Sequence, residues 1–143
     1  MSFLYDNARQ EFLKGNIDWD TGVQDFRVVL VNVSGSGTLY TANQATDTAL
    51  DDIPAGARIA TSGTLTTNVS LGAGVADAAD LTGGTTLAGV GGSDDVEALV
   101  IFRYNATESL ALLIAYVDNA AVAVVPNTGD IDVVWHASGI FKL

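Results

Sequence analysis

Three dense apolar stretches dominate the pattern of hydrophobic and polar positions along the chain. Residues 26–33 carry apolar side chains at both odd and even positions, which is typical of a central strand covered on both faces. Residues 96–104 and 110–117 are similarly apolar, and the five residues between them, 105–109, have the length of a hairpin loop. We predict that these last two stretches pair as antiparallel strands.

Shorter stretches alternate between apolar and polar residues or end at turn signals, and we predict short strands for them. In residues 131–136, Ile131, Val133 and Trp135 fall on one face. Residues 83–92 hold five of the 15 glycines, so we expect a loop there. The predicted short strands are residues 58–61, 64–71, 75–81, 131–136 and 139–143.

Helical spacing occurs at the start of the chain. Leu4, Ala8 and Phe12 follow one another at intervals of four, and Gly15 stands where a left-handed residue would end a helix. We predict a helix over residues 3–14. It would serve either as an amphipathic lid on the sheet or as an arm that reaches a neighbouring subunit.

The second half of the chain begins at a corner, residues 50–65. Asn43 is placed to cap a short helix over residues 44–50. Pro54 stops that helix, because the residue before a proline is pushed out of the helical region. Gly56 then suits a fixed turn into the following strand. We therefore expect the corner to have a structural role.

Together these elements predict a mainly β fold, an antiparallel β-sandwich or a squashed, jelly-roll-like barrel, with a short N-terminal helix and one further short helix. The chain has 143 residues, which is enough for one domain with a buried core, and it has no cysteine for disulfides. We expect residues 1–15 to form the N-terminal helix or arm and residues 16–143 to form a single β domain.

The charge balance narrows the choice of partners. Six Lys and Arg residues against 17 Asp and Glu residues give a net charge of -11 at pH 7. Such a surface repels the phosphate groups of nucleic acid and of anionic lipid. No stretch reaches the ~18 apolar residues of a membrane span, and the first residues lack the pattern of a secretory signal. We expect a soluble protein that binds neither nucleic acid nor membranes.

Patterns that could support catalysis are weak. His136 is the only histidine and is expected on the solvent side of its strand. Ser36 lies in a Gly-Ser-Gly loop without the outer glycine spacing of a nucleophile elbow. Gly72 and Gly74 supply only half of a dinucleotide-binding fingerprint and are expected to form a turn. Nothing in the spacing selects two carboxylates for a glycosidase pair, and we expect no enzymatic activity.

Pairs of aspartates raise the question of Ca²⁺, since hard cations take carboxylate oxygens. None follows the EF-hand pattern, and residues 18–22, the closest, lack the distal glutamate. Aspartate in turns usually accepts hydrogen bonds from its own backbone, so we expect no metal and no other cofactor, which thermal melts with and without EDTA would test. The pairs are Asp18 with Asp20, Asp51 with Asp52, Asp94 with Asp95, and Asp130 with Asp132.

A monomer of this size cannot easily bury both faces of residues 26–33 and of residues 110–117, which suggests that an apolar face contacts a partner. Because homo-oligomers usually close about a rotation axis, we expect a dimer or trimer of this chain. The residues predicted to form the interface are Phe3, Leu4, Tyr5, Phe12, Leu112, Leu113 and Tyr116.

Several segments give the chain a resemblance that covers most of its length. It resembles small virion structural proteins of tailed bacteriophages, most clearly in the corner from Leu50 to Gly63. The pattern departs from these proteins in residues 34–47 and in the Gly-rich residues 83–92. The segments that carry the resemblance are residues 18–21, 50–63, 74–80, 97–101, 113–116, 126–131 and 140–143.

The resemblance implies a component of a phage particle. Small acidic β domains on phage heads typically act as cement or decoration proteins, which bind between neighbouring major capsid proteins and stabilise the head. We therefore expect a homo-oligomeric cement protein on the outer surface of the capsid, made in the cytoplasm of the bacterial host. Its major partner would be the major capsid protein.

Two alternatives belong to other classes. A tail, connector or head-fibre component would contact the host or join tail parts, and it would occur in far fewer copies per virion than a cement protein. A virion enzyme would show an activity that is lost when His136 or an acidic residue is replaced.

Overall fold

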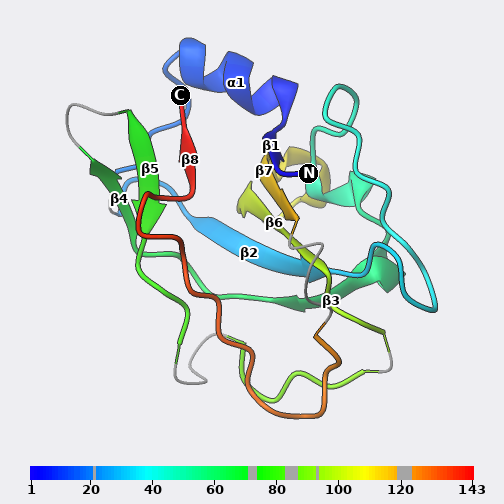
Figure 1. Cartoon of the computed structure of the whole chain (residues 1–143). Coiled ribbons are helices and arrows are strands. Elements are labelled where there is room, and N and C mark those ends of the chain that lie inside the picture. The colour runs from blue at the N-terminus through cyan, green and yellow to red at the C-terminus, as the bar shows by residue number, and fades with distance from the viewer. Residues whose placement is uncertain (21, 71–73, 83–86, 93, 119–123) are drawn as a thin grey trace.

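The computed structural model describes residues 1–20, 22–70, 74–82, 87–92, 94–118 and 124–143 (Figure 1). The fold is mainly β. Within these ranges it contains two antiparallel sheets, of five and three strands, one short α-helix and three 3₁₀ turns. The two sheets do not close into a barrel, so the barrel alternative of the sequence prediction is wrong.

The larger sheet has the strand order β1-β7-β6-β2-β3. Its interior strand β2 (Phe26–Val31) pairs with β6 (Ala98–Arg103), the middle strand of the sheet, on one side and with β3 (Arg58–Thr61) on the other. β6 also pairs with β7 (Leu113–Asp118), whose outer edge holds the short β1 (Phe3–Leu4). The structure thus confirms that the first apolar stretch contains an interior strand and that the other two stretches pair as antiparallel strands.

Strand β2 lies in the interior of the sheet, and its side chains are buried on both faces, as the apolar pattern requires. Phe26, Val28, Val29 and Val31 have no exposed surface. The strand ends two residues earlier than predicted, because the buried Asn32 side chain turns the chain. Its Nδ2 donates to the Ser36 carbonyl at 2.5 Å, and its Oδ1 accepts from the Gly35 amide at 3.0 Å.

The connection between β6 and β7 is longer than the predicted five residues. A 3₁₀ turn, η3 (Glu108–Leu110), occupies part of it, and the register between the two strands shifts between Ile101 and Phe102. Leu110, predicted to begin the second strand, is 63 % exposed. The apolar stretch begins before the residues that pair with β6, so the sequence prediction placed the start of β7 too early.

The smaller sheet has the order β4-β5-β8. Its strands are β4 (Thr67–Ser70), β5 (Val75–Ala78) and β8 (Phe141–Lys142), each shorter than the stretch predicted for it. Two parts of the sequence prediction lie outside the described residues: 71–73, at the end of the predicted strand and in the turn after it, and 83–86 of the Gly-rich loop.

The helix α1 (Asp6–Leu13) begins three residues later than predicted. Phe3 and Leu4 instead pair with Tyr116 and Ala115 of β7. The end of the helix agrees with the prediction, because Gly15 has a left-handed φ of 75°. Figure 1 shows α1 lying above the sheets, close to the C-terminal strand β8.

The predicted second helix over residues 44–50 is wrong. Residues 44–46 form a turn, in which the Asn43 side chain accepts a hydrogen bond from the Ala45 amide at 3.1 Å. Two 3₁₀ turns, η1 (Leu50–Asp52) and η2 (Ala55–Ala57), follow on either side of Pro54. The short polar side chain of Asn43 therefore stabilises a turn in place of a helix start.

The C-terminal residues 131–136 do not form a regular strand. Only Val133 makes a strand-like bridge, to Leu81. The predicted alternation nevertheless holds, because Ile131, Val133 and Trp135 are half-buried while the residues between them are exposed. The pattern correctly predicted which of these side chains face the interior, but the regular strand pairing that we predicted for residues 131–136 is wrong.

Within the described residues, no helix is long and apolar enough to cross a bilayer.

Candidate functional site

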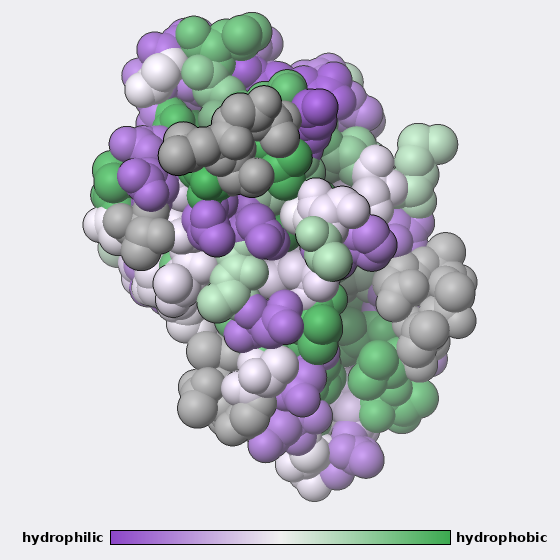
Figure 2. All heavy atoms as spheres, turned by 60° about the vertical axis from the view of Figure 1, so that its left-hand side comes forward, coloured by the Kyte–Doolittle hydropathy of each residue, from purple (hydrophilic) through white to green (hydrophobic). Residues whose placement is uncertain are grey.

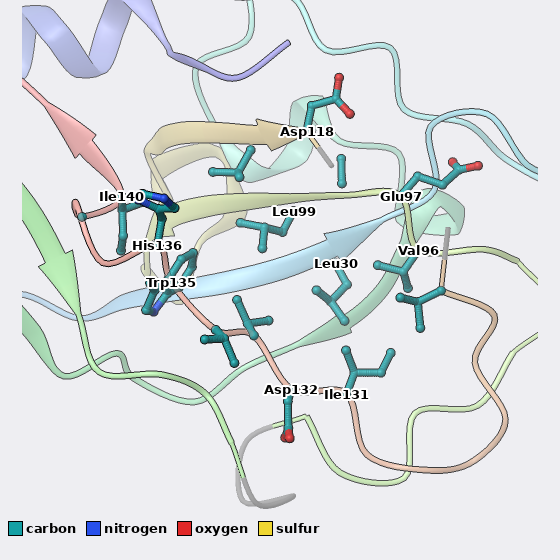
Figure 3. A pocket seen from close by; sticks show the side chains of 16 residues that line it. Leu30, Val96, Glu97, Leu99, Asp118, Ile131, Asp132, Trp135, His136 and Ile140 are labelled. Atoms are coloured by element: carbon teal, nitrogen blue, oxygen red, sulfur yellow. The ribbon is translucent and has the colours of Figure 1, made fainter. Parts of the chain in front are cut away.

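An open groove of about 560 Å³ lies between the five-stranded sheet and residues 131–140. Figure 3 shows Leu30 and Leu99 in the middle of the groove, with Trp135, His136 and Ile140 at one end and Val96 and Glu97 at the other. Most of the side chains that line the groove are apolar. They come from β2 (Leu30), β6 (Ala98, Leu99), β7 (Val117) and the C-terminal segment (Ile131, Val133, Val134, Trp135, Ile140), with Val96 and Val124 beside them.

Carboxylates stand at the rim of this groove. Glu97 and Asp118 project away from Leu30 and Leu99 on one side, and Asp132 projects away on the other (Figure 3). Among the described residues that line the groove there is no Lys or Arg. The groove therefore combines an apolar floor with a negative rim, in a chain whose net charge is already -11.

Glu97 also holds the loop that follows β2. Its carboxylate accepts hydrogen bonds from the amides of Val33 and Ser34 at 2.9 and 2.6 Å and from the Ser34 hydroxyl at 2.5 Å. Partial burial raises the pKa of Glu97, but the hydrogen bonds from the Ser34 side chain and from the backbone outweigh it, and the net pKa is lowered. Glu97 is therefore held in its charged form.

Asp118, at the same rim, binds the N-terminal residues of the chain. Its carboxylate forms an ion pair with the α-amino group of Met1, and its amide donates to the Ser2 hydroxyl at 3.1 Å. The first residues of the chain thus run along the outer edge of β7 beside the groove.

Trp135 and His136 lie at one end of the groove. The Trp135 indole Nε1 donates to the Ala79 carbonyl at 3.1 Å, and the Trp135 amide donates to an Asp80 carboxylate oxygen at 2.8 Å. The exposed His136 accepts a hydrogen bond at Nδ1 from the Ser138 amide at 3.1 Å. In the described part of the chain His136 has no carboxylate hydrogen-bonded to it.

A second, smaller groove of about 300 Å³ lies between the end of α1 and the smaller sheet. Trp19, Phe141 and Phe12 form its aromatic centre, and the ring centroids of Trp19 and Phe141 are 5.0 Å apart. Leu13 is 89 % exposed at the end of α1. Figure 2 brings this side of the molecule forward and shows its apolar atoms in separate areas among polar ones, without one continuous patch.

The residues predicted to form an interface lie away from the main groove. Phe3, Tyr5 and Tyr116 pack together, with ring centroids 5.2 and 5.1 Å from that of Phe3. Phe12 lines the second groove. Phe3 and Phe12 are half-buried, whereas one chain alone already buries Leu4, Tyr5, Leu112, Leu113 and Tyr116. The apolar pattern of these strands therefore does not by itself require a partner.

Hydrogen bonds link the polar side chains of Tyr5, Tyr40 and Asp47 in a partly buried network. The hydroxyls of Tyr5 and Tyr40 are 2.7 Å apart, and the Tyr40 hydroxyl donates to an Asp47 carboxylate oxygen at 2.8 Å. Burial raises the pKa of Tyr5 and of Tyr40 well above the usual range of tyrosine. Burial also raises the pKa of Tyr116, to about 12. These tyrosines are neutral and connect the N-terminal residues to the loop that holds Asp47.

Three of the aspartates considered as calcium ligands accept hydrogen bonds from backbone amides, Asp18 and Asp52 locally and Asp130 from a residue distant in the sequence. Asp18 accepts from the Asp20 amide at 3.0 Å, Asp52 accepts from the Thr48 amide at 2.6 Å, and Asp130 accepts from the Gly89 amide at 3.0 Å. No cluster of three or more His, Asp or Glu placed to hold a metal was found among the described residues.

Sequence reasoning did not identify the main groove. Its floor joins Leu99 and Val117 to Ile131 and Trp135, which the chain order separates widely. The alternation in residues 131–136 carried a partial signal, because it placed three apolar side chains on one face without showing that this face would remain half-exposed.

Comparison with models of protein families, with curated proteins and with solved structures found no match.

Proposed function

We propose that this chain is a structural protein of a bacteriophage virion, and specifically a capsid cement protein that binds between major capsid proteins on the outside of the head. It would act as a dimer or trimer. Packing of its two sheets as a jelly-roll-like β-sandwich is part of the same proposal.

The resemblance to small virion proteins supports the proposal through structural elements. The corner from Leu50 to Gly63 contains η1, η2 and β3, and residues 97–101 and 113–116 lie largely in β6 and β7. These segments form the core and the turns of the fold. The resemblance therefore concerns residues that build the fold, which is what we expect of a structural protein that acts by binding other proteins.

The observation that carries the proposal is the main groove. An apolar floor of half-buried side chains, bounded by carboxylates, suits the binding of another protein. Many weak contacts repeated over a capsid lattice would together hold the shell, because avidity adds to the affinity of each site. The negative surface also has no attraction for packaged DNA.

The number of copies per particle tests the proposal. Virions of the phage that encodes this chain are purified, and the chain is quantified on a gel against the major capsid protein. We expect hundreds of copies per particle, together with antibody labelling of the head. A dozen copies or fewer, with label on the tail, would favour the tail, connector or head-fibre alternative. Absence of the chain from purified virions would contradict both.

A further inference from the structure

Within residues 131–135, the backbone at Val134 forms a strand edge with an open side. On one side Val133 exchanges both backbone hydrogen bonds with Leu81, at 2.8 and 2.9 Å, and the Ile131 amide donates to the Leu87 carbonyl at 3.0 Å. Val134, between Val133 and Trp135, makes no backbone hydrogen bond in the described part of the chain. In extended backbone, neighbouring residues direct their amides and carbonyls to opposite sides. The edge at Val134 therefore faces away from Leu81.

The groove supplies apolar surface for a chain that would lie along this segment. Leu99 and Val117 of the larger sheet line the groove and are only half-buried, although Leu30 beside them is 2 % exposed. Val134 is 68 % exposed. A further extended segment in the groove would cover these side chains with every second residue of its own, which is how strand addition gains specificity.

The negative charge at the rim of the groove indicates which charges a bound peptide segment should carry. Glu97, Asp118 and Asp132 border the groove. The α-amino group of Met1 pairs with Asp118, and no Lys or Arg lines the groove among the described residues. A segment with Lys or Arg on either side of its apolar residues would complement this rim. A second copy of this chain is disfavoured as the occupant, because each copy carries a net charge of -11 and only six Lys and Arg residues.

We propose that residues 131–136 and the groove beside them bind an extended segment of a different protein by strand addition, and that this segment alternates apolar residues and carries Lys or Arg at its ends. This inference rests on the proposed function, since it names the chemistry of the partner segment that such a structural protein would hold.

Synthetic peptides test the proposal with the whole chain. The probe is an end-capped Lys-Val-Thr-Val-Thr-Val-Lys peptide. One matched control replaces both lysines by glutamate, and a second N-methylates alternate amides to block strand pairing. Binding is followed by amide NMR shifts. We expect the probe to bind at least tenfold more tightly than either control, to weaken as salt is raised, and to shift the signals of Leu99, Val117 and Val134.

Two charge-matched variants locate the site. Val117→Arg places a cation in the groove and should weaken probe binding at least tenfold. Val125→Arg makes the same change at a position that is 64 % exposed and does not line the groove, and it should change binding less than twofold. If Val117→Arg fails to fold, the N-methylated control decides, because it needs no change in the protein.

Three results would overturn the proposal: equal binding of the lysine and glutamate peptides, no binding of the probe, or shifts confined to other surfaces. Binding of chitotetraose in the groove without binding of the peptide would overturn it in favour of a glycan site. A failed peptide test together with hundreds of copies per virion would reject the groove proposal and leave the cement function in place. A virion without the chain would reject the cement function whatever the peptide result.

Discussion

The hydrogen-bonded pair of Tyr5 and Tyr40 allows a test of how the N-terminal residues are held. Tyr40→Phe removes a hydroxyl that donates to Asp47 and leaves the ring in place. It also leaves the Tyr5 hydroxyl, in a side chain with no exposed surface, without the group 2.7 Å away. The substitution should therefore destabilise the fold without changing its shape.

The magnitude follows from the two losses. Asp47 is half-exposed and keeps a hydrogen bond from the Asn43 amide at 2.8 Å, so losing the Tyr40 donor costs about 1 kcal/mol. Leaving the buried Tyr5 hydroxyl unpaired costs roughly 1–2 kcal/mol more. With an unfolding entropy of about 2.1 cal/mol/K per residue over 143 residues, a total of about 2–3 kcal/mol lowers Tm by roughly 7–10 °C.

Denaturation followed by circular dichroism measures the change. Tyr104→Phe is the matched control: Tyr104 is 41 % exposed and its ring, which carries the Arg27 guanidinium 3.5 Å from its centroid, stays in place. We expect its effect to stay within about 0.5 kcal/mol. The double variant Tyr5→Phe/Tyr40→Phe should cost less than the sum of the two single variants, because it leaves no unpaired hydroxyl. A Tyr40→Phe protein as stable as the parent, or strictly additive effects, would refute the reasoning.

Three further predictions concern packing, backbone strain and pH. Leu113→Ala should cost about 2–5 kcal/mol because Leu113 is fully buried, whereas Leu110→Ala, at a position 63 % exposed, should cost less than about 0.5 kcal/mol in the same urea titration. Thr128→Gly should stabilise the protein by roughly 0.5–1 kcal/mol, since Thr128 has a φ of 69° that a β-branched residue adopts only with strain, and a lower melting temperature would contradict this. Because burial raises the folded-state pKa of Tyr5, Tyr40 and Tyr116, their contribution to stability is complete below the unfolded tyrosine pKa of about 10 and is lost as the pH rises above it. Phenolate absorbance and circular dichroism should then change together in an alkaline titration, and ionisation of these tyrosines in a folded protein would contradict the expectation.

Periodicity predicted the elements whose environment is uniform along their length. β2 is buried on both faces, and β6 and β7 are six residues long and pair with each other at five positions, so local apolar density was sufficient to find them. The start of the chain was ambiguous for a physical reason. An apolar residue such as Leu4 suits the buried face of a helix as well as that of a strand. In the structure Leu4 is buried in a strand because its backbone pairs with Ala115 of β7, which lies more than 100 residues away in the sequence.

The candidate site was less accessible to prediction. Its floor consists of half-buried side chains, and alternation in a sequence does not distinguish a half-covered face from a covered one. The rim residues have individual partners, such as Ser34 for Glu97 and the N-terminus for Asp118, that depend on loop geometry. The sequence indicated that this chain has negative charge in excess, but it did not show where carboxylates and apolar surface would meet.

The corner from Leu50 to Leu65 shows why a stretch with strong turn signals says little about a binding site. Arg58 holds it from within: Nε donates to the Ile53 carbonyl at 2.9 Å, Nη2 donates to the Leu50 carbonyl at 2.8 Å, and Nη1 pairs with Glu108 at 2.8 Å. These bonds fix the turn around Pro54 and direct β3 into the sheet beside β2. A pattern maintained by such contacts identifies a fold. The guanidinium of Arg58 is thus engaged within the chain, whereas the groove leaves Leu99 and Val117 half-buried, so the partner segment that we propose is to be sought at the groove.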